Sequence, residues 1–207
     1  MIKVAIVLNS PSLTRLPKDE DIIICTDGGA KYIDNPDYLL GDMDSLTVAN
    51  NAKNTIILPT HKDVSDGEFA IRFIADKIKP DEIHIYGIAG GRTDHILGNL
   101  SLLALANELG YNAYGHDDIQ DIYFTNSKLS FKAKENDTIS IVPFSGDAVV
   151  SATGLEYPLN KLTLPIKTTL GISNVAMEED INISVLSGSV FVFHCIWFYW
   201  HFLSNIL

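Results

Sequence analysis

The sequence has little cysteine and no disulfide framework. Of its 207 residues only two are cysteines, Cys25 and Cys195, and each lies in an apolar run. Two isolated cysteines cannot build a disulfide scaffold or a cysteine-rich zinc site. Buried free thiols are typical of proteins from a reducing compartment. We therefore expect a cytoplasmic protein without structural disulfides.

The sequence also lacks a basic cluster. It has 15 Lys and Arg residues against 26 Asp and Glu residues, a net charge of −11. Proteins that bind nucleic acid gather Lys and Arg into a patch that contacts phosphates. Nucleic acid is therefore not an expected partner. The hydrophobic content of 46% with 20% charged residues is ordinary for a globular protein and excludes a disordered one.

The sequence also offers little sign of a leader peptide or a membrane span, and we expect neither. The first apolar run, Lys3–Leu8, is too short for a signal peptide. Val190–Leu207 is apolar and long enough to span a bilayer, but no Lys or Arg flanks it as orientation signals require. Four polar side chains interrupt it: His194, His201, Ser204 and Asn205. We expect a final strand at Val190–Phe193, then an atypical apolar tail (194–207) that packs on protein, and no membrane partner.

Short β-type runs alternate with helical segments in the first half of the chain. The predicted strands are Lys3–Leu8, Ile22–Cys25, Thr55–Leu58, Glu82–Tyr86 and Asn112–Tyr114. Ser65–Ile78 and Thr93–Leu109 carry apolar residues at helical spacing, and Gly110 is placed for a left-handed C-cap. This alternation predicts an α/β domain over residues 1–118, with a mostly parallel sheet covered by helices.

The second half contains short β-type runs without a helical period. Turn material separates these runs, notably at Ser145–Asp147, Thr153–Gly154 and Leu186–Ser189. The predicted strands are Asp121–Thr125, Leu129–Ala133, Thr138–Pro143, Ala148–Ala152, Lys161–Leu164 and Ile181–Val185. Closely spaced strands of this kind are typical of a sandwich or barrel. We therefore predict an all-β C-terminal domain over residues 119–207.

Two acidic motifs follow predicted strands in the first half. Asp27 is followed by Gly28 and Gly29, which permit a tight turn and close backbone approach to a ligand, although an ordinary turn explains them equally well. Asp42 and Asp44, one residue apart after the apolar run Tyr38–Leu40, can converge on one Mg²⁺ ion. Asp44 or Ser45 can instead simply cap a helix beginning at Thr47.

The third motif, residues 62–68, opens the first predicted helix. Ser65 and Glu68 fit a capping box, which is a structural role. Asp66, in the first helical turn, also suits the helix dipole. Lys62 and Asp63 have no such structural explanation. A lysine beside carboxylates at a helix entrance suits a phosphate group with its bound cation.

The fourth motif, residues 87–95, joins the strand Glu82–Tyr86 to the second helix. Glycines before a helix, including Gly90 and Gly91, can form an anion cradle, and Arg92 adds a planar donor fork that matches phosphate. Neither a Walker A loop nor a dinucleotide-binding motif is present. Asp94 can equally be an N-cap. His95 and Asn99 lie four residues apart and can bond each other.

Taken together, the four motifs place six carboxylates beside Lys62 and Arg92 at one edge of the predicted sheet. So many carboxylates require cations to coexist in one cleft. The combination favours a site for a metal ion and a polyphosphate. No serine elbow or cysteine–histidine pair suggests a covalent nucleophile.

The order of these motifs, together with the Gly171–Asn174 segment, resembles that of thiamine pyrophosphokinases, over residues 3 to about 193. The resemblance implies Mg²⁺-dependent transfer of the pyrophosphoryl group of ATP to the thiamine hydroxyl, which gives thiamine pyrophosphate and AMP. It also implies that the C-terminal domain binds thiamine. A further implication is a homodimer in which Gly171–Asn174 serves the active site of the partner chain.

The resemblance also implies roles for individual residues. Asp42, Asp44 and Asp66 would hold the metal ion, and Asp44, Asp66, Arg92 and Asp94 would be catalytic. The ATP-binding residues would be Asp27, Gly28, Lys62, Asp63, Gly90, Gly91, Arg92, His95 and Asn99. Thiamine would contact Gly171, Ser173 and Asn174. Two alternatives stay open on the residues alone: another Mg²⁺-dependent transferase that uses Asp42 and Asp44 as a D-x-D motif, or a non-catalytic nucleotide or thiamine binder.

Overall fold

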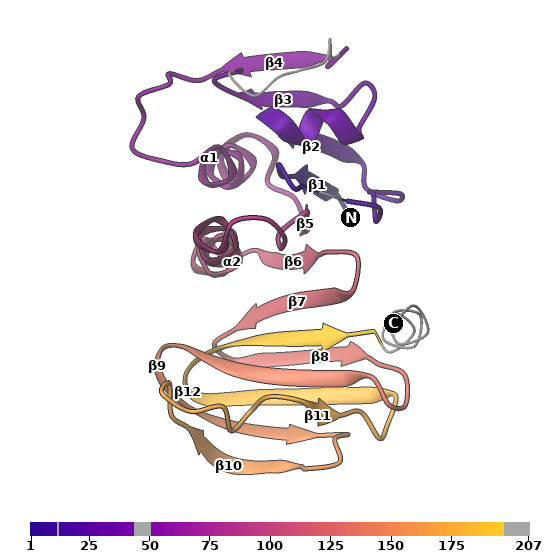
Figure 1. Ribbon diagram of the computed structural model, residues 1–207, viewed down its shortest axis with the longest axis vertical. Helices are drawn as coiled ribbons and strands as arrows, with labels where there is room; N and C mark the ends of the chain where they lie inside the picture. The colour runs from indigo at the N-terminus through magenta and orange to yellow at the C-terminus, as the bar shows by residue number, and fades with distance from the viewer. Residues whose placement is uncertain (12, 44–50, 197–207) are drawn as a thin grey trace. The chain divides into compact units, whose positions relative to one another are not determined.

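The structure is a computed structural model that describes residues 1–11, 13–43 and 51–196 (Figure 1). Asp44, Ser45, the helix expected from Thr47 and the tail beyond Ile196 lie outside the described residues. The chain forms two compact units, Met1–Asp118 and Ile119–Leu207. Among the described residues, no helix is both long and apolar enough to cross a bilayer.

The first unit contains a parallel sheet whose described strands are ordered β6-β5-β1-β2-β3-β4. Their bounds are β1 Lys3–Val7, β2 Ile22–Thr26, β3 Tyr38–Gly41, β4 Asn54–Ile57, β5 Glu82–Tyr86 and β6 Asn112–His116. The central strand β1 is apolar and fully buried from Val4 to Val7, as is typical of a parallel strand covered on both faces. Parallel pairing brings the carboxyl ends of these strands to one edge of the sheet.

The helices of this unit follow the predicted segments, with a change of type in one of them. Helix α1 spans Asp66–Phe73 and continues as a π-helical turn, η2, at Ile74–Ile78, so the predicted helix to Ile78 is α-helical only in its first part. Helix α2 spans Thr93–Glu108 and lies beside α1 (Figure 1). The predicted left-handed conformation of Gly110 is confirmed, with φ of +88°.

The second unit is antiparallel. Its described strands are β7 Gln120–Thr125, β8 Lys128–Lys132, β9 Thr138–Thr153, β10 Leu159–Leu164, β11 Asn174–Val175 and β12 Asp180–Cys195. Strand β12 is central because it pairs with β7, β8 and β9, while β9 also pairs with β10 and β11. Alternate side chains of β9 and β12, such as Ile139, Val150 and Ile183, face one apolar core.

Two turns predicted in this unit are wrong, because the residues lie within continuous strands. Ser145 and Gly146 adopt φ of +62° and +145°, yet β9 continues through them to Thr153. In the same way β12 runs through Leu186–Ser189, where its register against β9 shifts near Gly188, which has φ of +79°. Turn-forming residues produce a β-bulge here, and a bulge bends a strand without ending it.

Candidate functional site

A cavity of about 230 Å³ in the first unit gathers residues from distant parts of the sequence. The carboxylates of Asp27, Asp42 and Asp66 line it, together with Asn9, His95 and Asn99. Asn9, Asp27 and Asp42 follow strands β1, β2 and β3, while Asp66 and His95 lie in the first turns of α1 and α2. The predicted motifs therefore converge at the carboxyl edge of the sheet, where ligands bind in open α/β folds.

Lys62 lies among these carboxylates. Its Nζ atom is 3.0 Å from Oδ1 of Asp66 and 3.8 Å from Oδ2 of Asp42. The three side chains are only 17%, 23% and 12% exposed, in the order Lys62, Asp66 and Asp42. Ion pairs that are largely withdrawn from water are screened weakly. The site therefore combines concentrated negative charge with one positively charged side chain.

Glycines allow the ends of β1, β2 and β3 to approach closely around Asp27. A Cβ atom on Gly28 would lie 2.5 Å from Cγ of Asn9, and one on Gly29 would lie 2.2 Å from the carbonyl oxygen of Val7. Asp27 itself is buried and has φ of +24°. Asp27, Gly28 and Gly29 begin η1, a 3-10 helix over Asp27–Tyr32. The chain therefore forms a short helix here and not the tight turn that the sequence suggested. The absence of side chains at Gly28 and Gly29 lets this helix pack closely against the end of β1.

The N-terminus of α1 is fixed by the predicted cap. The Ser65 hydroxyl accepts a hydrogen bond from the backbone N–H of Glu68 at 3.2 Å, which confirms Ser65 as the N-cap. The Glu68 carboxylate is held by Arg72 at 2.8 Å, so it does not complete the capping box as predicted. Asp66, the first residue of α1, lines the cavity, and the cap at its neighbour Ser65 fixes where this helix begins.

The glycine-rich segment before α2 carries Arg92 and Asp94 on the surface. Nη2 of Arg92 lies 2.6 Å from Oδ2 of Asp94, and the two side chains are 74% and 63% exposed. This hydrogen bond raises the pKa of Arg92 and lowers the pKa of Asp94. Neither residue lines the cavity. The N-cap of α2 is Arg92, without a side-chain cap, so the alternative N-cap role for Asp94 is wrong.

The other predicted ATP-binding residues divide between cavity and surface. His95 and Asn99 line the cavity, but the amide of Asn99 donates to the carbonyl of Ile88 at 3.2 Å, so the suggested bond between the two is wrong. Asp63 is exposed. Gly90 and Gly91 have φ of +100° and +75°, a left-handed conformation that favours glycine.

The residues after β1 contribute more to the site than the sequence motifs indicated. Asn9 lines the cavity, and its Oδ1 atom accepts from Nζ of Lys31 at 3.3 Å. Nζ of Lys31 also donates to the carbonyl of Ser10 at 2.7 Å. Ser10 and Pro11 in turn pack beneath Gly90 and Gly91. The signal available in the sequence was the position of Asn9 directly after a buried strand.

In the second unit, the segment Gly171–Asn174 packs on β9. The carbonyl of Gly171 accepts from the N–H of Ile141 at 2.8 Å, and a Cβ atom there would lie 2.0 Å from the carbonyl oxygen of Ile141. The N–H of Ser173 donates to Oγ of Ser140 at 3.0 Å, and Ser173 has φ of +61°. Gly171 is thus required by close backbone packing, and Ser173 is held in a rare conformation.

Asn174 is buried and holds the backbone of Tyr157. Its Nδ2 donates to the Tyr157 carbonyl at 2.7 Å, and its Oδ1 accepts from the Tyr157 N–H at 3.1 Å. Tyr157 itself is 65% exposed, and Leu170 and Ile172 are exposed nearby in the sequence. The Asn174 side chain thus fixes the backbone at Tyr157, whose ring is exposed.

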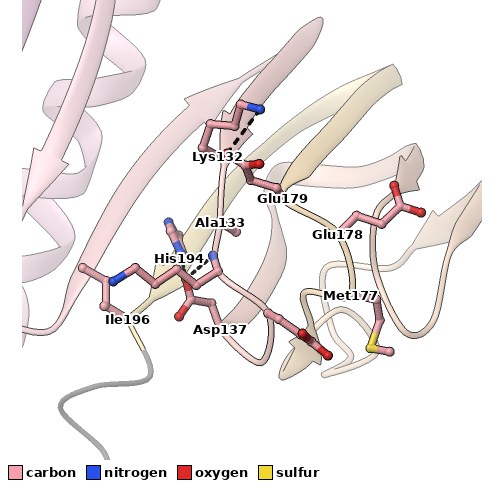
Figure 2. A pocket seen from close by; sticks show the side chains of 10 residues that line it. Lys132, Ala133, Asp137, Met177, Glu178, Glu179, His194 and Ile196 are labelled. Atoms are coloured by element: carbon pink, nitrogen blue, oxygen red, sulfur yellow. Dashed lines mark hydrogen bonds and ion pairs between the residues drawn. The ribbon is translucent and has the colours of Figure 1, made fainter.

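A larger cavity of about 690 Å³ lies in the second unit and was not predicted from the sequence (Figure 2). Figure 2 shows His194 beside Asp137, and their Nε2 and Oδ2 atoms are 2.7 Å apart. Lys132 pairs with Asp180 at 2.9 Å and with Glu179 at 3.5 Å.

Comparison with known proteins identifies the family. Residues 13–114 match the model of the thiamin pyrophosphokinase catalytic domain, and residues 126–190 match the model of the vitamin B1 binding domain of the same enzymes. The thiamine pyrophosphokinase of Bacillus subtilis is 32% identical over 191 residues, which cover 86% of this chain and 89% of that protein. The chain belongs to the thiamine pyrophosphokinase family.

Solved structures of thiamine pyrophosphokinases have the same fold. The Bacillus subtilis enzyme superposes with a TM-score of 0.81 at 27% identity and covers 94% of this chain and 99% of its own. The Geobacillus thermodenitrificans enzyme superposes with a TM-score of 0.80 at 23% identity, covering 94% and 97%. The mixed arrangement of parallel and antiparallel strands is therefore that of the thiamine pyrophosphokinase fold.

Proposed function

We propose that the chain carries out the reaction of its family, ATP-dependent pyrophosphorylation of thiamine, with the polyphosphate bound at the cavity around Asp42 and Asp66. The observation that carries this proposal is the convergence of Asp27, Asp42 and Asp66 on one cavity at the carboxyl edge of a parallel sheet. Three carboxylates there suit a cation and a polyphosphate better than an anionic ligand alone.

The residues around this cavity fit a divalent cation. Carboxylate oxygens are the ligands that Mg²⁺ prefers, and the ammonium of Lys62 already lies between Asp42 and Asp66. Among residues 1–11, 13–43 and 51–196, no group of three or more His, Cys, Asp or Glu side chains is arranged to hold a metal ion. Two carboxylates are too few to complete the ligands of a metal ion. Asp42 and Asp66 would therefore hold Mg²⁺ together with Asp44 and with oxygens of the substrate.

The chain's own side chains would position the phosphates and balance their charge. When bound, Mg²⁺ supplies charge neutralisation for the polyphosphate. Lys62 and Arg92 would neutralise phosphate oxygens, which requires Arg92 to leave Asp94 and turn toward the cavity. The remaining proposed ATP contacts are Asp27, Gly28, Asp63, Gly90, Gly91, His95 and Asn99, with Asp94 as a further catalytic group. The thiamine hydroxyl would attack the β-phosphorus directly, with AMP as leaving group.

We propose that the second unit presents thiamine through Gly171, Ser173 and Tyr157. The hydrogen bonds of Asn174 to the Tyr157 backbone support a positioning role for Asn174, because its amide is already engaged. The exposed Tyr157 ring offers an aromatic face to a flat heterocyclic ligand. Asn174 would thus act on thiamine through Tyr157 rather than by direct contact.

The experiment that tests the function is product analysis. Purified protein is incubated with ATP, Mg²⁺ and thiamine, and mass spectrometry follows thiamine pyrophosphate and AMP. We expect the two products in equal amounts, and none without thiamine. Formation of ADP instead of AMP would indicate a different phosphotransfer. Binding of both ligands without AMP would indicate a non-catalytic binder.

We further propose a cytoplasmic homodimer in which the thiamine-binding segment of one copy serves the ATP site of the other. The exposed apolar side chains of Tyr157, Leu170 and Ile172 support a surface that meets a partner. Mixing tests the arrangement: an Asp66→Asn variant and a Ser173→Tyr variant, each inactive alone, should regain activity when refolded together. Light scattering that shows only monomers would contradict it.

A further inference from the structure

The ammonium of Lys62 lies beside two of the carboxylates that the proposed function assigns to a metal ion. Its ammonium is 3.0 Å from Oδ1 of Asp66, four residues later, and 3.8 Å from Oδ2 of Asp42, which follows β3. All three side chains are less than a quarter exposed, and the still more deeply buried Asp27 lines the same cavity. The lysine therefore faces the very carboxylates that the proposed function assigns to a divalent ion.

Electrostatics explains why a positive group is needed here. Carboxylates withdrawn from water repel one another, and the repulsion is relieved either by protonation or by a cation. An ammonium group on a flexible four-carbon stem can supply that charge and can also move away. A Mg²⁺ ion bound to these carboxylates at 2.0–2.1 Å would lie only a few ångströms from the ammonium, and the two positive charges repel each other in a site withdrawn from water.

We propose that Lys62 is an internal counter-cation that occupies the carboxylates of Asp42 and Asp66 in the metal-free protein and competes with a divalent ion for them. The inference rests on the proposed function, since it takes these carboxylates as metal ligands. Displacement leaves the ammonium tethered beside the cavity, where it is free to contact an anionic polyphosphate. Binding of the metal ion and binding of the nucleotide thus favour each other.

The competition distinguishes this role from that of an ordinary structural ion pair. A structural pair predicts that loss of Lys62 lowers stability and leaves metal affinity unchanged. Competition predicts that loss of Lys62 raises the affinity for a divalent ion in the absence of nucleotide. The coupling is reciprocal: if the ammonium weakens the binding of the metal ion, the metal ion weakens the contact of the ammonium by the same free energy.

The test measures Mn²⁺ binding without nucleotide, by the electron paramagnetic resonance signal of free Mn²⁺. We expect Lys62→Met to bind Mn²⁺ about tenfold more tightly than the wild type, within the usual range of coupling between sites. Lys62→Arg, which keeps the charge, should bind like the wild type. The matched control is Lys31→Met, because Lys31 contacts Asn9 of the same cavity through Oδ1 at 3.3 Å. It removes the same charge without touching the carboxylates.

An equal gain in Lys31→Met and Lys62→Met, or no gain in Lys62→Met, would overturn the proposal. If Lys62→Met does not fold, Lys62→Gln serves, since its amide can still donate to a carboxylate but carries no charge. Thermal melting gives a second readout: saturating Mn²⁺ should raise the melting temperature of the neutral variant more than that of the wild type. The product analysis tests the proposed function separately. If AMP forms but Lys62→Met shows no gain in Mn²⁺ affinity, the competition is contradicted and the proposed function is not.

Discussion

The side-chain amide of Asn174 binds both backbone groups of Tyr157, donating to its carbonyl at 2.7 Å and accepting from its N–H at 3.1 Å. Two segments separated by 17 residues are thereby fixed to each other. Asn174 itself is buried, and its Oδ1 also accepts from the N–H of Val175. The exposed ring of Tyr157 depends on this contact for its position.

Replacement of Asn174 by Asp should impair thiamine binding selectively. The aspartate loses the N–H donor and places a carboxylate against the partly buried Tyr157 carbonyl, and the loss of this hydrogen bond costs about 1–3 kcal/mol. We expect the KM for thiamine to rise about tenfold while the KM for ATP stays constant. Steady-state kinetics with each substrate varied in turn measures both. An equal rise in the two KM values would contradict a local positioning role.

Replacement of Asp66 by Asn should abolish most of the turnover and spare the fold. The neutral amide is a poorer metal ligand and removes a partner of Lys62. If the transition state loses several kcal/mol of charge stabilisation, kcat falls by a factor on the order of a thousand. Glu68→Gln is the matched control, because Glu68 lies in the same helical turn and pairs with Arg72. We expect Glu68→Gln to retain turnover in a coupled AMP assay, and comparable losses in both variants would argue against a specific role for Asp66.

Replacement of Ser65 by Ala should weaken α1 at its start. Ser65 accepts from the N–H of Glu68, and removal of such a cap costs about 1 kcal/mol of folding free energy. Urea unfolding followed by circular dichroism measures the change. Ser65→Asp, which keeps a cap acceptor and favours the helix dipole, should recover most of the loss. Equal stability of Ser65→Ala and the wild type would show that packing alone fixes this helix start.

The elements of the first unit were predicted well because their signals are local. Buried apolar runs such as Lys3–Leu8 and Glu82–Tyr86 correspond to β1 and β5, and the Ser65 cap was recognisable from four residues of sequence. Parallel pairing then follows from the alternation of strands and helices. The approach of Asp27, Asp42 and Asp66 to one cavity is a consequence of that topology.

Features that depend on tertiary contacts were not predictable. Ser145–Gly146 has the composition of a turn, but pairing of β9 with neighbouring strands carries it through as a bulge. The link from Asn174 to Tyr157 joins positions with no shared motif. In each case a distant contact overrides or supplements the local pattern.

Acidification should destabilise the first unit through a pair of histidines on the neighbouring strands β5 and β6. Nδ1 of His84 lies 2.9 Å from Nε2 of His116, and the ring planes are within 9° of each other, as in an in-plane N–H···N hydrogen bond. Burial lowers the pKa of His84, and the nearby His116 lowers it further, against opposing contributions from Glu20 and Glu82. The bond itself requires that one of the two facing nitrogens carries no proton.

The sign of the pH effect follows from this lowered pKa. The unfolded chain takes up a proton at His84 near its ordinary value of 6.5, before the folded protein does. Stability should therefore fall as the pH drops below 6.5, with a slope of at most about 1.4 kcal/mol per pH unit from this residue. Urea unfolding at pH 7.5, 6.5 and 5.5 measures the slope. His84→Gln should flatten it, whereas substitution of the exposed His61 by Gln should not. A slope unchanged in His84→Gln would show that other groups govern the acid response.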